Sequence, residues 1–466
     1  MRIAEPTGGV HDADNGPLDY RRAPTSGETR RPLISGAGLA FGLTRPSILV
    51  LLCAGTLMHL GIALAQAAAR VRLWDFSHYY VAALAMRTGL NPYAVDLRPL
   101  GRQLGLDGIA RATDTPFFLL CFEPLTWLRP GAAYWTWFAI NAAALVLAMV
   151  LILRAAPRLN TRQLISLSAI ILLYPPLSNH IFFSQTQIVI LMLVVVTMRS
   201  LESGRDRTAG LALATAGLLK VFPLVIAGYF VVRQRWRALG WTAIGLIAGT
   251  AATVIAFGLE RNASFVAGTY LTRSAGFLAR PANVALGSFV SRMFWYAAGE
   301  VTMSPWLDWT RAITVLAAEV SVVGLTIFAT LPRARTMSEG SITIGSHESR
   351  EFALWVTAAI MLSPTAWIHY LVLLILPFML IAAAGWNGTA SPRALWLMAA
   401  SYAAISLSMA ITGSAQNSLA HRPHLKAALE ECATLSLLLA YASAWFFAID
   451  RPAGSSSGDR PDSAPV

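Results

Sequence analysis

Long hydrophobic runs, separated by short polar segments, make up most of this chain. The runs do not alternate between polar and apolar residues, so they predict helices surrounded by lipid or by other helices rather than half-buried strands. We expect spans near residues 47–69, 131–153, 164–178, 181–198, 208–232, 238–258, 308–330, 352–364, 366–384, 393–412 and 427–448. The pattern predicts an all-α, polytopic membrane bundle of about ten to twelve transmembrane segments.

Composition supports this fold class. The chain is 56% hydrophobic and 13% charged, whereas soluble domains carry about 25% charged residues. The net charge of +12 is typical of arginines held in cytoplasmic loops near anionic lipid head groups, so we expect membrane lipids and no nucleic acid as partners. The three cysteines lie in apolar surroundings without metal-ligand spacing, which predicts neither a disulfide framework nor a metal site.

The chain divides into a membrane domain and two tails. Residues 1–44 and 451–466 are polar and are predicted to be a disordered cytoplasmic tail and a flexible C-terminal tail. The membrane domain, 45–450, includes a long segment from 70 to 130 that carries amphipathic helices. Its last part, 116–128, is too short to span a bilayer and is predicted to be re-entrant or interfacial. The run 208–232 is expected to form two half-helices, because Lys220 and Pro223 interrupt it.

Basic loops predict the orientation of the bundle. Five arginines before or at the first span place the N-terminus in the cytoplasm: Arg21, Arg22, Arg30, Arg31 and Arg45. If 116–128 is re-entrant and 208–232 turns back at Lys220, the later basic loops fall on the same side. The exception is the long first outer loop, which contains Arg70, Arg72, Arg87, Arg98, Arg102 and Arg111. We expect the inner or plasma membrane, with the active site facing the periplasm or the cell exterior.

In this topology, ionisable and polar residues that lipid makes costly converge on the outer side. They are Asp75 after the first span, Lys220 at the helical break, His369 between two spans, Gln185 in an outer turn, and Asn283 and Arg292 in a later outer segment. The sequence therefore predicts a polar site at the outer end of the bundle.

Each of these residues also has a simpler interpretation. Asp75 suits the N-cap of a helix that begins near Phe76, and Lys220 suits an interfacial lysine that reaches toward water. His369 suits a hydrogen-bonded interfacial histidine, and Arg292 a head-group contact. Trp74, Tyr79 and Tyr80 suit an aromatic belt. Five independent explanations of this kind would not be expected to share one side.

At these positions the sequence resembles glycosyltransferase family 87. The resemblance begins with the run Asp75-Phe76-x-x-Tyr79-Tyr80-x-Ala82-Ala83, followed by Gly89-x-Asn91-Pro92-Tyr93. It continues, in order, with Pro124-Leu125, the Gln185 region, Leu219-Lys220-x-x-Pro223, Asn283 through Arg292, and Ser363-Pro364-x-x-Trp367-x-His369-Tyr370. These matches extend over about residues 46–385. The chain departs from the family pattern at Ser184, where Gly is usual, at Gln187, where Asn is frequent, and at Val284-Ala285.

The resemblance implies a GT-C fold and transfer of a sugar, with mannose as the default, from a polyprenyl-phosphate donor to a glycolipid or glycan acceptor. It implies an inverting displacement, for which Asp75 is the expected base. Lys220, Arg292 and His369 are the expected donor-phosphate ligands. Weaker candidates for substrate binding are Trp74, Tyr79, Tyr80, Asn91, Gln185, Asn283 and Trp367. No cofactor and no metal are expected.

Two other classes stay open at this point. A transporter or flippase also carries ionisable residues in a helical bundle, but it predicts an inverted repeat and polar residues near the midplane. No clear repeat is visible, and the polar set lies toward one side. A membrane assembly factor without catalysis predicts no defined cavity.

Overall fold

A computed structural model describes residues 44–69, 75–106, 110–155, 159–270, 280, 282–298, 304–331, 347–414 and 423–450. Within these ranges the chain is helical, and the only pairing of extended backbone is an isolated bridge between Asn283 and Trp367. The all-α class predicted from the sequence is confirmed. The predicted tails, except Thr44, and Trp74 lie outside the described residues.

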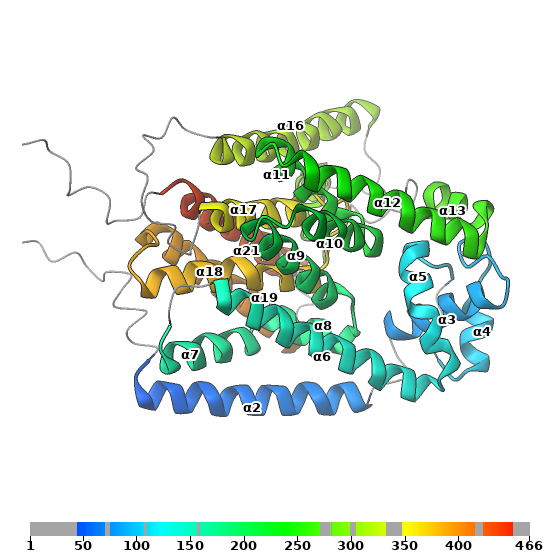
Figure 1. Ribbon diagram of the computed structural model, residues 1–466, viewed down its shortest axis with the longest axis horizontal. Helices are drawn as coiled ribbons and strands as arrows, with labels where there is room; N and C mark the ends of the chain where they lie inside the picture. Colours follow the sequence, from blue (N-terminus) through cyan, green and yellow to red (C-terminus); the bar gives the residue numbers. More distant parts are fainter. Residues whose placement is uncertain are drawn as a thin grey trace, which may run out of the picture.

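Figure 1 shows the arrangement of the helices. In order they are α2 (Pro46–Ala69), α3 (Asp75–Arg87), α4 (Arg98–Gln103), α5 (Pro116–Phe122), η1 (Glu123–Trp127), α6 (Pro130–Ala155), α7 (Thr161–Leu172), α8 (Pro175–Phe183), α9 (Gln187–Glu202), α10 (Asp206–Leu219), η2 (Phe222–Ile226), α11 (Ala227–Val232), α12 (Trp236–Phe257), α13 (Leu259–Phe265), η3 (Val266–Tyr270), α15 (Leu286–Ala298), α16 (Pro305–Thr330), α17 (His347–Met361), η4 (Ile368–Leu374), α18 (Ile375–Trp386), α19 (Pro392–Ser414) and α21 (Pro423–Ile449).

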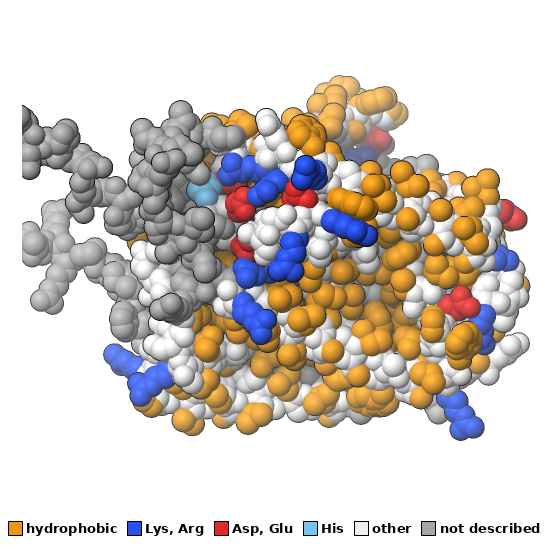
Figure 2. Space-filling view, viewed as in Figure 1, with side chains coloured by type: hydrophobic (Ala, Val, Ile, Leu, Met, Phe, Trp, Pro, Cys, Tyr) orange, Lys and Arg blue, Asp and Glu red, His pale blue; other side chains and the backbone are white. Residues whose placement is uncertain are grey.

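Five helical segments of the described chain are long and apolar enough to cross a membrane, and a sixth is obtained if the bent pair α7–α8 is one span. The five are Pro130–Arg154, Trp236–Phe257, Pro305–Thr330, Ile368–Trp386 and Glu431–Ile449. Of the other predicted spans, 47–69 and 393–412 form the continuous helices α2 and α19, and the rest form shorter or interrupted helices. Large apolar side chains on the outside of the bundle are exposed, among them Leu57 at 73%, Ile255 at 85% and Trp306 at 74%. Hydrophobic side chains cover wide areas of the surface (Figure 2), as expected of a protein with lipid around it.

Two breaks interrupt the predicted helical spans 164–178 and 208–232. The predicted span 164–178 is wrong at its end, because α7 stops at Leu172 and α8 begins at Pro175 with a bend of 52°. Pro175 and Pro176 lack the backbone N–H groups that would continue α7. The predicted break in 208–232 is confirmed: α10 ends at Leu219, Lys220 is extended, and η2 follows with Pro223 in its first turn.

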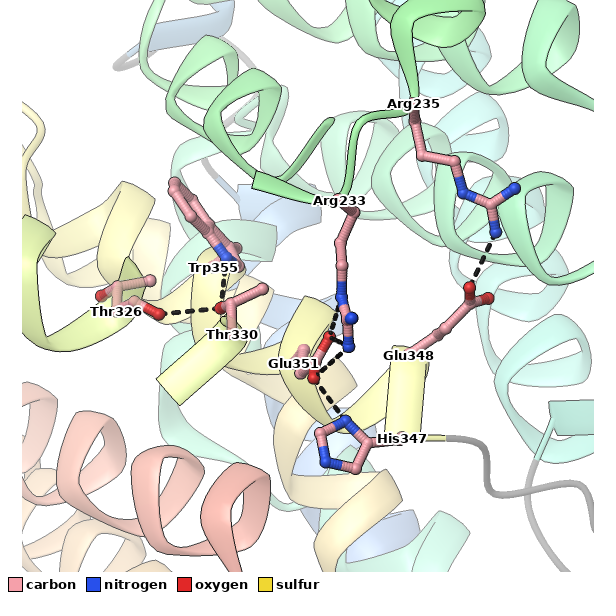
Figure 3. A network of polar contacts seen from close by, with 8 residues as sticks. All are labelled: Arg233, Arg235, Thr326, Thr330, His347, Glu348, Glu351 and Trp355. Atoms are coloured by element: carbon pink, nitrogen blue, oxygen red, sulfur yellow. Dashed lines mark hydrogen bonds and ion pairs between the residues drawn. The ribbon is translucent and has the colours of Figure 1, made fainter. Parts of the chain in front are cut away.

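At the other end, charged side chains join α11 and α17 (Figure 3). Arg233 Nε donates to Glu351 Oε2 at 2.7 Å, and Glu351 is fully buried. His347 contacts the same carboxylate, and Arg235 Nη2 lies 2.7 Å from Glu348 Oε1. The loop that carries Arg233 and Arg235 was predicted to lie on the same side of the membrane as Arg350, and both arginines contact the first turns of α17, which includes Arg350.

Loss of the Glu351 charge should destabilise the bundle. Glu351→Gln leaves the Arg233 guanidinium partly buried without its countercharge, which typically costs about 3 kcal/mol. We expect a clearly lower midpoint of thermal unfolding in detergent. Asp308→Asn removes a carboxylate that is 57% exposed and pairs with Arg311, and exposed pairs contribute about 0–1 kcal/mol. Equal shifts for the two variants would contradict this account.

Candidate active site

Asp75 is the first residue of α3, and its carboxylate faces the loop between α8 and α9. The Gln185 amide donates to Asp75 Oδ2, and His78 Nδ1 lies 3.4 Å from Asp75 Oδ1. Tyr79, one turn into α3, donates from its hydroxyl to Gln185 Oε1 at 2.7 Å. The Asp75 side chain is about a quarter exposed, so it is held by neighbours and still accessible to a substrate.

The loop that carries Gln185 is fixed by its backbone. Ser184 adopts a left-handed conformation, with φ of 54°, which is uncommon for a residue other than glycine. The Ser184 carbonyl accepts a hydrogen bond from Trp137 Nε1 at 2.8 Å. This contact ties the loop to α6 and keeps Gln185, which is 4% exposed, directed at Asp75.

Lys220 approaches the same glutamine from the other side. Its ammonium lies 3.4 Å from Gln185 Oε1 and 3.3 Å from the Tyr370 hydroxyl, and 4.7 Å from the centre of the Tyr370 ring. A lysine over an aromatic face gains a cation–π attraction. Among the described residues, no carboxylate lies within ion-pair distance of this ammonium. The direct hydrogen-bond partners of this cation are therefore neutral, which suits an anionic ligand.

Asp114 is a member of this group that the sequence reasoning missed. The Tyr93 hydroxyl donates to the Asp114 carbonyl at 2.8 Å, and the next residue, Thr115, caps α5 and donates to the Leu218 carbonyl at 2.6 Å. These bonds hold Asp114 beside the end of α10, because Leu218 lies two residues before Lys220. Burial raises the pKa of Asp114 to about 6, with Lys220 lowering it and Asp75 raising it. In the sequence, the Asn91-Pro92-Tyr93 motif was the signal that could have pointed to Asp114, because Tyr93 binds its carbonyl.

His369 lies at the beginning of η4, next to Tyr370. It is 7% exposed, its ring centre lies 5.2 Å from that of Tyr370, and it interacts electrostatically with Lys220 and His180. Its Nε2 atom has no hydrogen-bond partner in the described chain. His369 is therefore close to Lys220 and has a polar atom available for a ligand.

Asn283 shapes the loop before His369. Asn283 Oδ1 accepts from the backbone N–H of Ala366 at 2.9 Å, and its Nδ2 donates to the Pro364 carbonyl at 3.3 Å. Asn283 is fully buried and pairs with Trp367 in the isolated bridge. These contacts make Asn283 a residue that positions the loop rather than one that faces a substrate.

Arg292 lies apart from the Asp75 group. Its Nε and Nη2 atoms bind Glu431 in α21 at 2.5 and 2.8 Å, and its Nη1 donates to the Asn283 carbonyl and to Ser288 Oγ, each at 2.7 Å. Every nitrogen of this guanidinium, which is 2% exposed, is occupied. This arrangement does not bring Arg292 to the cation site. It ties the Asn283 loop to the last helix.

Tyr80 and Asn91 also bind protein groups away from Asp75. The Tyr80 hydroxyl donates to the Leu128 carbonyl at 2.8 Å, and Asn91 Nδ2 donates to Ser264 Oγ at 3.0 Å. Tyr80 therefore ties α3 to the end of η1, and Asn91 ties the outer loop to α13. Within the described ranges, no three His, Cys, Asp or Glu side chains are grouped so as to hold a metal ion.

A carboxylate, a cation and an amide thus meet in one site, and a comparison with protein families identifies the class of this chain. The profile of "Glycosyltransferase family 87" matches residues 113–347, just over half of the chain. This chain belongs to glycosyltransferase family 87. The match supports a glycosyltransferase over the transporter and assembly-factor alternatives.

One similar solved structure is the crystal structure of ArnT from Cupriavidus metallidurans in the apo state. It aligns with 14% sequence identity and a TM-score of 0.39, over 84% of this chain and 75% of that one. A search of curated proteins finds no matching relative.

Asp114 should give the transfer reaction a pH dependence. Because its pKa is raised to about 6, it becomes protonated as the pH falls through about 6. This removes a negative charge from beside Asp75 and Lys220, so we expect the transfer rate to fall. Protonation relieves the cost of a buried charge, so folding stability should rise over the same interval. Rates and unfolding midpoints from pH 5 to 8 measure both effects.

Asp114→Asn is the matching variant, since it keeps the shape of the side chain without the titration. It should have a low rate whose dependence near pH 6 is lost. An unchanged pH profile in Asp114→Asn would assign the titration to another group.

Proposed function

We propose that this protein transfers a sugar from a polyprenyl-phosphate donor to a hydroxyl of a lipid-linked or polysaccharide acceptor. The acting end of the bundle is the one that carries Asp75 and Lys220, facing the periplasm or the cell exterior. The observation that carries the proposal is that Asp75 and Lys220 bind the two ends of one amide, that of Gln185. Asp75 and Lys220 are thus held on either side of the Gln185 amide. A base and a cation at this separation suit a reaction in which the base accepts a proton and an anion leaves beside the cation.

In the proposed step, the acceptor oxygen attacks the anomeric carbon of the donor sugar and forms the new glycosidic bond. The bond between that carbon and the phosphate oxygen breaks, and its electron pair leaves with the polyprenyl phosphate. The hydroxyl proton passes to the Asp75 carboxylate, so that charge and atoms balance. Family resemblance implies inversion at the anomeric carbon, which a single displacement of this kind produces.

Lys220 stabilises the departing phosphate. Negative charge grows on the phosphate oxygens as the bond breaks, and a fixed ammonium beside them lowers the energy of that state. His369, with its unpartnered Nε2, is the second proposed ligand of the phosphate. Arg292 is not included, because all of its donors are bound to protein groups.

The acceptor side is proposed to lie along α3. Asp75 is accessible there, and His78 lies one turn away on the same helix. Mannose is the default donor sugar from the family resemblance. Tyr79 and Gln185 hold Asp75 in place through the bonds described above, so they are proposed to act as positioning residues for the base.

Asp75→Asn should abolish transfer while leaving donor binding largely intact. Loss of a general base typically lowers the rate about 10²- to 10⁴-fold, and Asn retains an oxygen that accepts from Gln185. The measurement is transfer of radiolabel by purified protein in vesicles from a panel of polyprenyl-phosphate sugars. The panel also identifies the donor sugar.

Asp96→Asn is the matched control, because Asp96 lies in the same outer loop but its side chain is 45% exposed and pairs with Arg98. It should transfer sugar at the wild-type rate. A fully active Asp75→Asn protein would remove Asp75 as the base. No transfer by the wild type from any donor in the panel would contradict the function itself.

A further inference from the structure

Gln187 carries a buried side-chain amide that has no role in the proposed reaction step. It is the first residue of α9, two residues after Gln185, and none of its side chain is exposed. Neither its Oε1 nor its Nε2 has a hydrogen-bond partner among the described residues. Burying such a group unpaired costs about 1–3 kcal/mol, and an unsatisfied buried group of this kind calls for an explanation.

The neighbours of Gln187 connect it to the cation site. The next residue, Ile188, donates its backbone N–H to His180 Nε2 at 3.2 Å. His180 in turn interacts electrostatically with Lys220 and with His369. Helix α9 also packs against η4, which begins with Ile368 and His369. Gln187 therefore lies at the point where the Gln185 loop enters α9, next to the residue that binds His180.

The chemistry of the amide indicates which part of the donor it meets. A phosphate accepts hydrogen bonds, so a lysine ammonium satisfies it. An amide with both atoms unpaired needs a ligand that donates and accepts. The hydroxyl groups of a sugar do both, and the sugar of the donor is bonded directly to the phosphate that Lys220 is proposed to bind.

We propose that Gln187 is a specificity-determining residue that hydrogen-bonds hydroxyl groups of the donor sugar. This inference rests on the proposed function and deepens it. The position of the amide at the start of α9 determines which hydroxyl groups it can reach, so Gln187 contributes to the choice of sugar.

The test uses Gln187→Leu, which has a similar size and no polar atoms. Equilibrium binding of polyprenyl-phosphate mannose and of sugar-free polyprenyl phosphate is measured for both proteins, together with the unfolding midpoint without ligand. We expect the wild type to prefer the sugar-bearing lipid at least about tenfold, as two neutral hydrogen bonds allow. Gln187→Leu should lose that preference, bind sugar-free polyprenyl phosphate as before, and unfold at an equal or higher temperature.

Tyr174→Phe is the matched control, because the Tyr174 hydroxyl is also buried without a partner but packs against Phe378 and Tyr402. It should leave the lipid preference unchanged. A lower unfolding midpoint for Gln187→Leu would make Gln187 structural, and weaker binding of both lipids would make it a phosphate ligand. A retained preference in Gln187→Leu, or none in the wild type, would also overturn the proposal.

Failure of this inference is distinguishable from failure of the proposed function. A wild type that transfers sugar, paired with a Gln187→Leu variant of unchanged preference, overturns only the role of Gln187. A wild type that transfers from no donor in the panel overturns the function, whatever the lipid preference is.

Discussion

The ammonium of Lys220 imposes the constraint on which the site depends. A charged group within a helical bundle in lipid is costly unless it is paired or solvated. Lys220 has a glutamine oxygen, a tyrosine hydroxyl and an aromatic face as direct neighbours, and it interacts electrostatically with Asp114. Among the described residues no carboxylate forms a direct ion pair with it, so a bound anion would supply a direct countercharge. The break between α10 and η2, at which Lys220 is extended, is the structural condition for this arrangement.

The two ends of the bundle differ in whether their charged side chains are paired. At the end with α17, Arg233 and Glu351 neutralise one another, and this pair fixes the half-helix α11 against α17. At the other end, the same two parts of the chain carry Lys220 and Tyr370, which meet with no described carboxylate within ion-pair distance of the ammonium. Closed charge pairs thus stabilise one end, while the other keeps a cation free for a substrate. Arg292 follows the first pattern, because Glu431 and backbone carbonyls occupy it.

Local sequence patterns predicted what depends on hydropathy and on proline. They indicated the helical class, the break at Lys220 and the convergence of Asp75, Gln185 and Lys220. They did not indicate Asp114, because its position depends on hydrogen bonds from Tyr93 and Thr115 in a loop without periodicity. Arg292 looked like a phosphate ligand because its partner, Glu431, lies 139 residues away in the last helix. A local sequence pattern cannot predict pairs of residues that lie this far apart in the chain.

The most direct test of this account is whether Lys220 recognises a phosphate. The measurement is the equilibrium affinity of the wild type and of Lys220→Met for a polyprenyl phosphate and for the uncharged polyprenol of the same length. A charge-assisted hydrogen bond contributes about 1.5–3 kcal/mol, so the wild type should prefer the phosphate by about 10- to 150-fold. Lys220→Met should bind both lipids with similar affinity. An undiminished preference for the phosphate in Lys220→Met would contradict the account.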